Sequence, residues 1–325
     1  MPTYNVEQYI AKAIESVLDQ SFKDWELIVV DDGSPDNSSA IAKEYADRDN
    51  RIRIVKKENG GLSDARNFGL QFARGEYVHL FDPDDYLNDH FYNYLYSKTV
   101  ETDCDVVIAG YQVEYIGRDG NGRIERVECP VDSQGKFDSE SNISPLRFVC
   151  YAWNKLFKRE FLTTNNLQYE KGLSRIEDAE FMSRFVGHNP KVGFVPFSGY
   201  AYVQRPVQTL SKGFDETIIP LAERRIGIDR TLLKYFIGNI EDEAALVNGF
   251  KSSALRATLN RLYDVPKGNL KRPRKSYLKE ISDTLLPDKL TISNRGFKRS
   301  MFDRLTYLGL KYRMYFIINL LQKAR

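Results

Sequence analysis

The first 110 residues alternate short apolar runs with stretches of helical period, and this alternation limits the folds open to the chain. The apolar runs have the length of strands and end in turn-forming residues. They lie at 25–30, 52–55, 76–81 and 105–110. Strands this apolar need helices on both faces of their sheet. The sequence therefore predicts an α/β fold with a Rossmann-like, mostly parallel sheet.

The composition fits a large globular chain and argues against several classes of protein. Of the 325 residues, 42% are hydrophobic and 28% are charged. Cys104, Cys129 and Cys150 show no C-x-x-C spacing, so neither a disulfide framework nor a zinc site is expected. The longest apolar-rich run, 314–321, falls short of the about 20 residues that span a bilayer. We therefore expect a cytoplasmic protein.

Carboxylates follow two of the predicted strands. Asp31 and Asp32 end the run "WELIVV", and Asp82, Asp84 and Asp85 follow "EYVHLF". Ligands of parallel sheets bind beyond the carboxyl ends of the strands. Three neighbouring acids repel one another unless a cation neutralises them, and Mg²⁺ typically takes one or two carboxylates plus phosphate oxygens. The motif predicts a metal–diphosphate site, and a solvated turn that caps the next helix is the alternative.

Further candidates lie near predicted helix starts. Arg66, in "GGLSDARNFG", could reach a phosphate or pair with Asp64. The stretch is not G-x-G-x-x-G, so a nicotinamide or flavin site is disfavoured. Glu177 and Asp178 could supply a general base with a raised pKa, or they could simply complement the helix dipole. The three histidines do not cluster, and His79 is expected in the core.

The order of these motifs resembles glycosyltransferase family 2. P-T-Y-N, V-D-D-G-S, G-G-L-S-x-A-R-N-x-G, D-x-D-D and E-D-A-E-F follow one another. The resemblance is strong over Pro2–Tyr86, weaker to about Ser211 and absent in the tail. It implies the GT-A fold and transfer of one sugar from a nucleotide-diphosphate donor, with UDP expected. The acceptor would be a hydroxyl on a growing cell-surface glycan, such as a lipid-linked precursor of a capsule or exopolysaccharide.

The resemblance also assigns the donor contacts. Tyr4 would stack on the nucleobase, Asp32 would accept hydrogen bonds from it, and Arg66 would face the diphosphate. The implied nucleotide-binding residues are Pro2, Tyr4, Asp31, Asp32, Arg66 and Asp84.

The resemblance also implies which residues bind a metal ion and which residue acts as the general base. Asp85, with Asp84, would bind Mn²⁺ or Mg²⁺, and Asp82 is the alternative first acid because "DPDD" can be registered in two ways. Asp178 matches the general base of inverting members, with Glu177 beside it. In-line attack would then invert the anomeric carbon.

The resemblance is less specific about the residues that contact the acceptor. Trp153 and Lys155 lie where related enzymes face the acceptor, and Arg205 with Ser211 would close over phosphates. The Q-x-x-R-W signature of processive synthases is absent, so transfer of a single sugar is favoured. Two other functions stay open, which are transfer from a nucleotide-linked polyol and non-catalytic binding of a nucleotide sugar.

The C-terminal region differs in charge from the rest. We expect a catalytic domain over 1–213 and a helical region over 214–325. Residues 267–279 hold six basic residues and no acid, and residues 291–325 hold eight basic residues and one acid. Such helices could lie on the anionic inner face of the cell membrane. They could also pack on the catalytic domain or on a second subunit, and no nucleic-acid motif is present.

The start of the chain is unusual. Asn5 and Gln8 have the spacing of a capping box, so a helix is predicted from Asn5 to about Asp19. In the family that the chain resembles, P-T-Y-N ends a central first strand, which would take about five or six residues. We therefore expect this strand to be missing from the sequence, Tyr4 to be poorly held, and a longer chain to be more stable.

Overall fold

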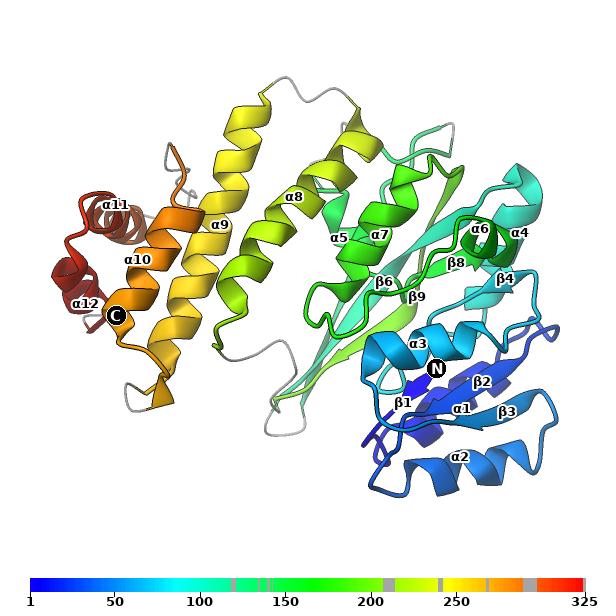
Figure 1. The fold of residues 1–325 in the computed structure, drawn as a ribbon. Coiled ribbons are helices and arrows are strands. Elements are labelled where there is room, and N and C mark those ends of the chain that lie inside the picture. Colours follow the sequence, from blue (N-terminus) through cyan, green and yellow to red (C-terminus); the bar gives the residue numbers. More distant parts are fainter. Residues whose placement is uncertain are drawn as a thin grey trace. The chain divides into compact units, whose positions relative to one another are not determined.

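The computed structural model describes most of the chain and divides it into two compact units. The described residues are 1–117, 121–133, 135–138, 141, 143–206, 214–238, 242–266, 269–288 and 297–323. The units are Met1–Val207 and Gln208–Arg325 (Figure 1). The boundary expected after residue 213 falls in 207–213, which lies outside the described residues.

The first unit begins with a parallel three-stranded sheet of order β1-β2-β3. Its strands are β1 (Pro2–Thr3), β2 (Leu27–Asp31) and β3 (Ile52–Lys56). The helices between them are α1 (Ile10–Leu18), α2 (Ser38–Ala46) and α3 (Leu62–Leu70). Leu27 and Val29 form a core with α1 and α2 on one face, while Val30 meets Gly69 of α3 on the other. The predicted α/β arrangement, with helices on both faces, is confirmed.

The later strands of this unit form a second, mixed sheet instead of extending the first. Its order is β4-β8-β6-β9-β5, and β7 pairs with β6. The strands are β4 (Tyr77–Val78), β5 (Tyr86–Leu87), β6 (Val106–Ile116), β7 (Gly122–Val127), β8 (Lys155–Lys158) and β9 (Val192–Gln204). Only β6 and β9 pair in parallel. The helices are α4 (Phe91–Thr102), α5 (Leu146–Val149), α6 (Arg159–Thr164) and α7 (Glu177–Gly187).

The start of the chain differs from its prediction in two respects. A short β1 is present, with Pro2 opposite Val30, although no first strand was expected. The capping box is wrong, because α1 begins only at Ile10 and Asn5 has a left-handed backbone with φ of 56°. The amide of Asn5 is instead satisfied by Ser34 Oγ at 2.7 Å, so this turn is fixed by the loop after β2.

The second unit is helical, as predicted. Its helices are α8 (Ile218–Ile237), α9 (Glu243–Asp264), α10 (Arg274–Leu285), α11 (Phe297–Lys311) and α12 (Tyr315–Lys323). Leu259, Tyr277, Ile281, Leu310 and Ile318 are buried in one core that joins α9 to α12. Within the described residues, no helix combines the length and the apolar character needed to cross a bilayer.

Candidate active site

Loops after β1 and β2 are joined by hydrogen bonds at the carboxyl ends of these strands. Val6 N donates to Ser38 Oγ (3.0 Å), and Glu7 N donates to Asp36 Oδ2 (2.9 Å). Tyr4 lies in this arrangement with about half of its side chain exposed. Pro2 is buried in β1. The predicted stacking residue is therefore accessible at the edge of the first sheet.

Asp32 has a structural function that its sequence did not reveal. Its carboxylate is buried and accepts hydrogen bonds from Lys57 Nζ (2.6 Å), Gly60 N (3.0 Å) and Gly61 N (2.8 Å). These bonds fix the turn into α3, where Gly61 has a φ of 83° that favours glycine. Neighbouring Asp31 accepts from Ser34 N at 2.9 Å. Both acids thus hold the loops around the predicted nucleobase site.

Arg66 joins two carboxylates that lie far apart in the sequence. Its guanidinium donates to Asp82 Oδ1 (2.7 Å) and to Asp178 Oδ1 (2.6 Å), and its side chain is 1% exposed. The alternative partner, Asp64, pairs instead with Lys57 and Lys171. α3 therefore aims Arg66 between the loop that follows β4 and the start of α7.

Asp178 occupies the first turn of α7, at the positive end of the helix dipole. Besides Arg66, its oxygens accept from Tyr169 OH (3.1 Å) and from Ala152 N (3.1 Å). These contacts fix the carboxylate, of which 15% stays exposed. Beside it, burial first and then the charge of Asp178 raise the pKa of Glu177, whose Oε2 has no partner among the described residues.

The acids of "DPDD" point in different directions. Asp85 is buried, and its oxygens accept from Tyr200 OH (2.7 Å) and Val203 N (2.8 Å). Burial raises its pKa well above the usual range, and the charges of Asp84 and Asp82 add to this. The side chains of Asp82 and Asp84 are 21% and 47% exposed. Asp85 is thus turned toward β9 and is less accessible to a metal ion than Asp82 or Asp84.

Asp82 and Asp84 fit a divalent cation better. Burial raises the pKa of Asp82 to about 6 and also raises that of Asp84, although Arg66 lies against Asp82 and Arg205 lies near Asp84. Partly exposed carboxylate oxygens are suitable ligands for Mg²⁺ or Mn²⁺. Within the described residues, no group of three or more His, Cys, Asp or Glu side chains could hold a metal ion. A cation here would need oxygens from a donor as well.

Lys155 does not face an acceptor, contrary to the prediction. Its side chain is fully buried, and Nζ donates to Phe148 O (2.6 Å), Asn154 Oδ1 (2.8 Å) and Tyr151 O. Burial lowers its pKa to about 7. A lysine in a predicted loop suggests exposure, but these three oxygens hold it inside. It instead fixes the segment that presents Ala152 N to Asp178.

Trp153 is also more buried than expected, at 4% exposed. Its ring stacks on Tyr200 (centroids 4.5 Å apart) and on Tyr151 (4.8 Å). Tyr151, at 37% exposed, is the accessible end of this aromatic stack, and sequence reasoning missed it. The spacing Y-x-W ahead of a strand was the sequence signal that could have indicated Tyr151. His79, expected in the core, is only partly buried and lines a cavity, with Nε2 2.6 Å from Trp153 O and a pKa lowered to about 4 by burial.

Arg205 contacts the "DPDD" segment at Asp84. It donates to Asp84 O (2.8 Å), and its guanidinium lies 3.9 Å from the centre of the Tyr9 ring. Ser211 lies outside the described residues. The structure thus groups Arg66, Asp82 and Asp178 by direct contacts and ties Arg205 to Asp84.

Comparison with known proteins identifies the family of the chain. The model of glycosyl transferase family 2 matches residues 1–164, about half of the chain. The chain belongs to this family. The match includes every strand of the first sheet together with Arg66 and the "DPDD" acids. Asp178 and Arg205 lie beyond the matched residues, so their assignment depends on the contacts described above.

Two relatives and one solved structure extend the comparison. The uncharacterized glycosyltransferase EpsJ of Bacillus subtilis (strain 168) is 33% identical over 63% of this chain, and the match spans 60% of EpsJ. Glycosyltransferase GlyG of Streptococcus pneumoniae (serotype 4) is 30% identical over 74% of this chain and 85% of GlyG. S. aureus TarS 1-349, crystallised with UDP-GlcNAc, superposes with a TM-score of 0.59 at 20% identity, covering 99% and 89% of the two chains. The GT-A fold is confirmed.

Proposed function

We propose that this family 2 member is an inverting, non-processive glycosyltransferase. It moves a sugar from a UDP-sugar to a hydroxyl of a growing, lipid-linked cell-surface glycan. The observation that carries the proposal is the Arg66 cluster, in which one buried guanidinium contacts both Asp82 and Asp178. Such a cluster brings a carboxylate that can accept a proton next to groups that can hold a diphosphate.

The chain's own residues account for each step. Asp178 accepts the proton of the acceptor hydroxyl while that oxygen bonds to the anomeric carbon from the face opposite the diphosphate. The bond from the anomeric carbon to the diphosphate oxygen breaks, and the electron pair leaves with the nucleoside diphosphate. Asp82 and Asp84 would hold Mn²⁺ or Mg²⁺. When bound, such a cation would neutralise the negative charge that develops on the departing diphosphate. Arg66 and Arg205 supply further positive charge.

The acceptor site would lie beside Asp178. Ala152 N donates to Asp178 Oδ2, and the neighbouring Tyr151 is exposed. An aromatic face next to a carboxylate suits a sugar or polyol, because one side binds C–H groups and the other a hydroxyl. We include transfer from a nucleotide-linked polyol as the second candidate, since the same residues would serve it.

Membrane attachment is the last part of the proposal. α11, α12 and the turn between them expose the apolar side chains Leu305, Leu308, Tyr312, Phe316 and Leu320. Arg304, Lys311 and Arg313 are exposed on the same segment, and its acid Asp303 is buried. Apolar and basic side chains together suit an anionic lipid surface, which is where a lipid-linked acceptor would be found.

A donor screen tests the proposed function. Nucleoside diphosphate release is measured with UDP-, GDP- and dTDP-sugars and with nucleotide-linked polyols, with Mn²⁺ present. UDP-sugars should give the highest release, and an Asp178→Asn chain should give background release. A chain that binds nucleotide sugars but releases no diphosphate from any donor, with any acceptor glycan tried, would be a binding protein instead.

A further inference from the structure

Lys155 is a fully buried titratable group that sugar transfer as proposed does not use. Its Nζ donates to Phe148 O (2.6 Å), to Asn154 Oδ1 (2.8 Å) and to Tyr151 O. All three partners are neutral oxygens. Burying a charged amine among neutral partners costs free energy, and an apolar side chain of similar length would avoid that cost. The position of this amine therefore indicates that its hydrogen bonds have a use.

The partners of Lys155 match the protonated amine. Asn154 Nδ2 donates to Ala109 O (2.8 Å) and to Phe148 O (3.2 Å), so the oxygen of this amide is the atom that faces Lys155. Two carbonyl oxygens and one amide oxygen accept hydrogen bonds but donate none. An ammonium group has three N–H donors and serves all three oxygens. A neutral amine has only two, and it would direct its lone pair at the third oxygen.

Lys155 and Asp178 hold opposite ends of one peptide group. Tyr151 O accepts from Lys155 Nζ. Ala152 N, which belongs to the same peptide group, donates to Asp178 Oδ2 at 3.1 Å. Because a peptide group is planar, the carbonyl and the N–H move together. A change at the lysine therefore reaches the carboxylate proposed as the base, and it also moves the exposed ring of Tyr151.

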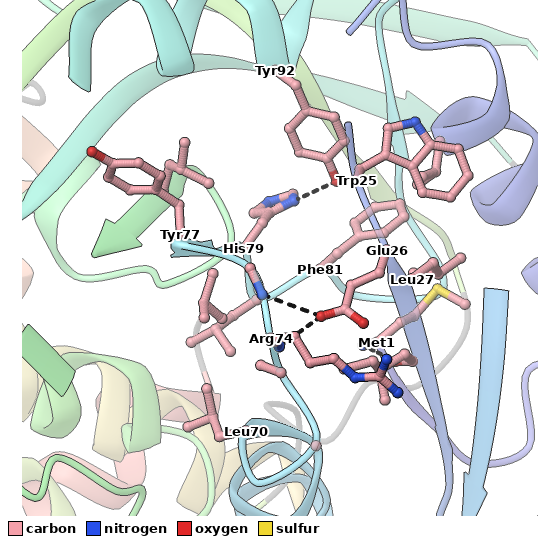
Figure 2. A pocket seen from close by; sticks show the side chains of 18 of the residues that line it. Met1, Trp25, Glu26, Leu27, Leu70, Arg74, Tyr77, His79, Phe81 and Tyr92 are labelled. Atoms are coloured by element: carbon pink, nitrogen blue, oxygen red, sulfur yellow. Dashed lines mark hydrogen bonds between the residues drawn. The ribbon is translucent and has the colours of Figure 1, made fainter. Parts of the chain in front are cut away.

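The following residue is fixed by a second titratable group. Trp153 O accepts from His79 Nε2 at 2.6 Å, and His79 Nδ1 lies 3.1 Å from Tyr92 OH (Figure 2). Burial lowers the pKa of His79 to about 4, so this ring is neutral around pH 7. The histidine thus holds its end of the segment in the same way on both sides of neutrality.

Charged and titratable groups face Lys155 from three elements. Burial lowers the pKa of Lys155 to about 7, and the Asp178 carboxylate on α7 opposes this shift. The thiols of Cys150, after α5, and Cys129, after β7, also act on the amine. Burial raises the pKa of Cys129 to about 12, so this thiol is neutral around pH 7. The amine therefore changes its charge within the range of an ordinary assay.

We propose that Lys155 is a positioning residue for sugar transfer and that the chain is active when this amine is protonated. The ammonium holds the Tyr151 carbonyl, and the peptide group then orients Asp178 through Ala152 N. Loss of the proton removes one of the three hydrogen bonds and loosens this peptide group. The inference rests on the proposed function, in which Asp178 is the base. It concerns kcat and not donor binding, because the donor contacts lie on other residues.

The pH dependence of the parent chain tests this without any substitution. At saturating UDP-sugar and acceptor, kcat is measured from pH 6 to pH 9. It should fall on the alkaline side by up to about tenfold per pH unit, since the protonated fraction falls at that rate above the pKa. The Kd of UDP should stay constant between pH 7 and pH 9. A kcat that stays flat to pH 9 would overturn the proposal.

Substitutions assign the alkaline fall to this amine. Lys155→Met should lower kcat and lack the fall, because no proton is left to lose. Lys155→Arg keeps its charge at every pH of the assay, so it should recover part of kcat and also lack the fall. Lys191→Met, at an exposed lysine, is the matched control and should keep the parent profile. The same alkaline fall in the parent and in both Lys155 variants would contradict the assignment.

Hydrogen exchange at Ala152 separates this proposal from the proposed function. After correction for the intrinsic rate, the Ala152 N–H should be protected at pH 6.5 and less protected at pH 8.5 in the parent. In Lys155→Met it should be poorly protected at both values. This readout needs no transferase activity, so it reports on Lys155 even if the parent releases no diphosphate from any donor. Equal protection in both chains at both pH values would overturn the role of Lys155.

Discussion

Arg66 and Asp178 lie 112 positions apart in the sequence and form a 2.6 Å ion pair inside the first unit. The same guanidinium contacts Asp82, so one residue of α3 connects the loop after β4 to the start of α7. Each oxygen of Asp178 accepts at least one hydrogen bond. If Asp178 is the base, the acceptor hydroxyl must reach a lone pair that these donors leave open.

Asp178→Asn should abolish transfer while donor binding survives. The amide keeps the size of the side chain and its contact with Ala152 N but cannot act as a base. The loss in kcat should be about 10²- to 10⁴-fold, as for general bases elsewhere. Steady-state kinetics and titration with UDP measure the two effects, and exposed Glu160→Gln is the matched control. Full activity of the Asn variant would remove Asp178 from this role.

Arg66→Met should cost more stability than its size suggests. The substitution leaves Asp82 and Asp178 without their cation, and breaking a buried pair typically costs about 3–5 kcal/mol. Urea unfolding at pH 7 measures the free energy of unfolding, with Arg48→Met, at an exposed side chain just beyond α2, as the control. Arg66→Lys should recover part of the stability, since the charge returns without the bidentate geometry. A neutral effect of Arg66→Met would show that the cluster contributes little.

Asp84→Asn and Asp85→Asn should separate metal binding from folding. The first should weaken Mn²⁺-dependent UDP binding, because the half-exposed Asp84 carboxylate is a better ligand than one turned toward β9. The second should chiefly lower the melting temperature, since it disturbs the bonds to Tyr200 and Val203. Calorimetric titration with and without Mn²⁺ distinguishes them. A folded Asp85→Asn chain that no longer binds Mn²⁺ would restore the sequence-based assignment.

Double substitution of Tyr312 and Phe316 by Ser should weaken binding to anionic vesicles. Both side chains are more than 60% exposed, so the change removes apolar area without opening a core. Flotation with phosphatidylglycerol-containing vesicles should recover the parent chain, and pure phosphatidylcholine vesicles should not. Ile237→Ser, an exposed apolar residue on α8, is the matched control. Equal flotation of all three chains would exclude the α11–α12 surface.

Features of the fold and the site that depend on local sequence patterns could be predicted, whereas those that depend on contacts between distant residues could not. Strand ends and helix starts follow from local patterns, so the places of Asp32, Asp82 and Asp178 were predicted. The direction of a side chain within a motif was not, because "DPDD" does not reveal that Tyr200 and Val203 draw Asp85 inward. Several strands of the second sheet were predicted, but their assembly into a separate, mixed sheet was not, since most of them pair across separations in sequence that a local pattern does not encode.

Lys155 should make stability depend on pH above neutrality. Burial lowers its pKa from 10.5 to about 7 in the folded chain, so between these values the unfolded chain binds a proton that the folded chain does not. Stability from this group therefore rises with pH through the window, by up to about 1.4 kcal/mol per unit. Lys155→Met should lack this rise. The difference in free energy of unfolding, parent minus variant, should therefore increase between about pH 7 and pH 9. Parallel pH profiles from urea titrations would show that the buried amine keeps its proton.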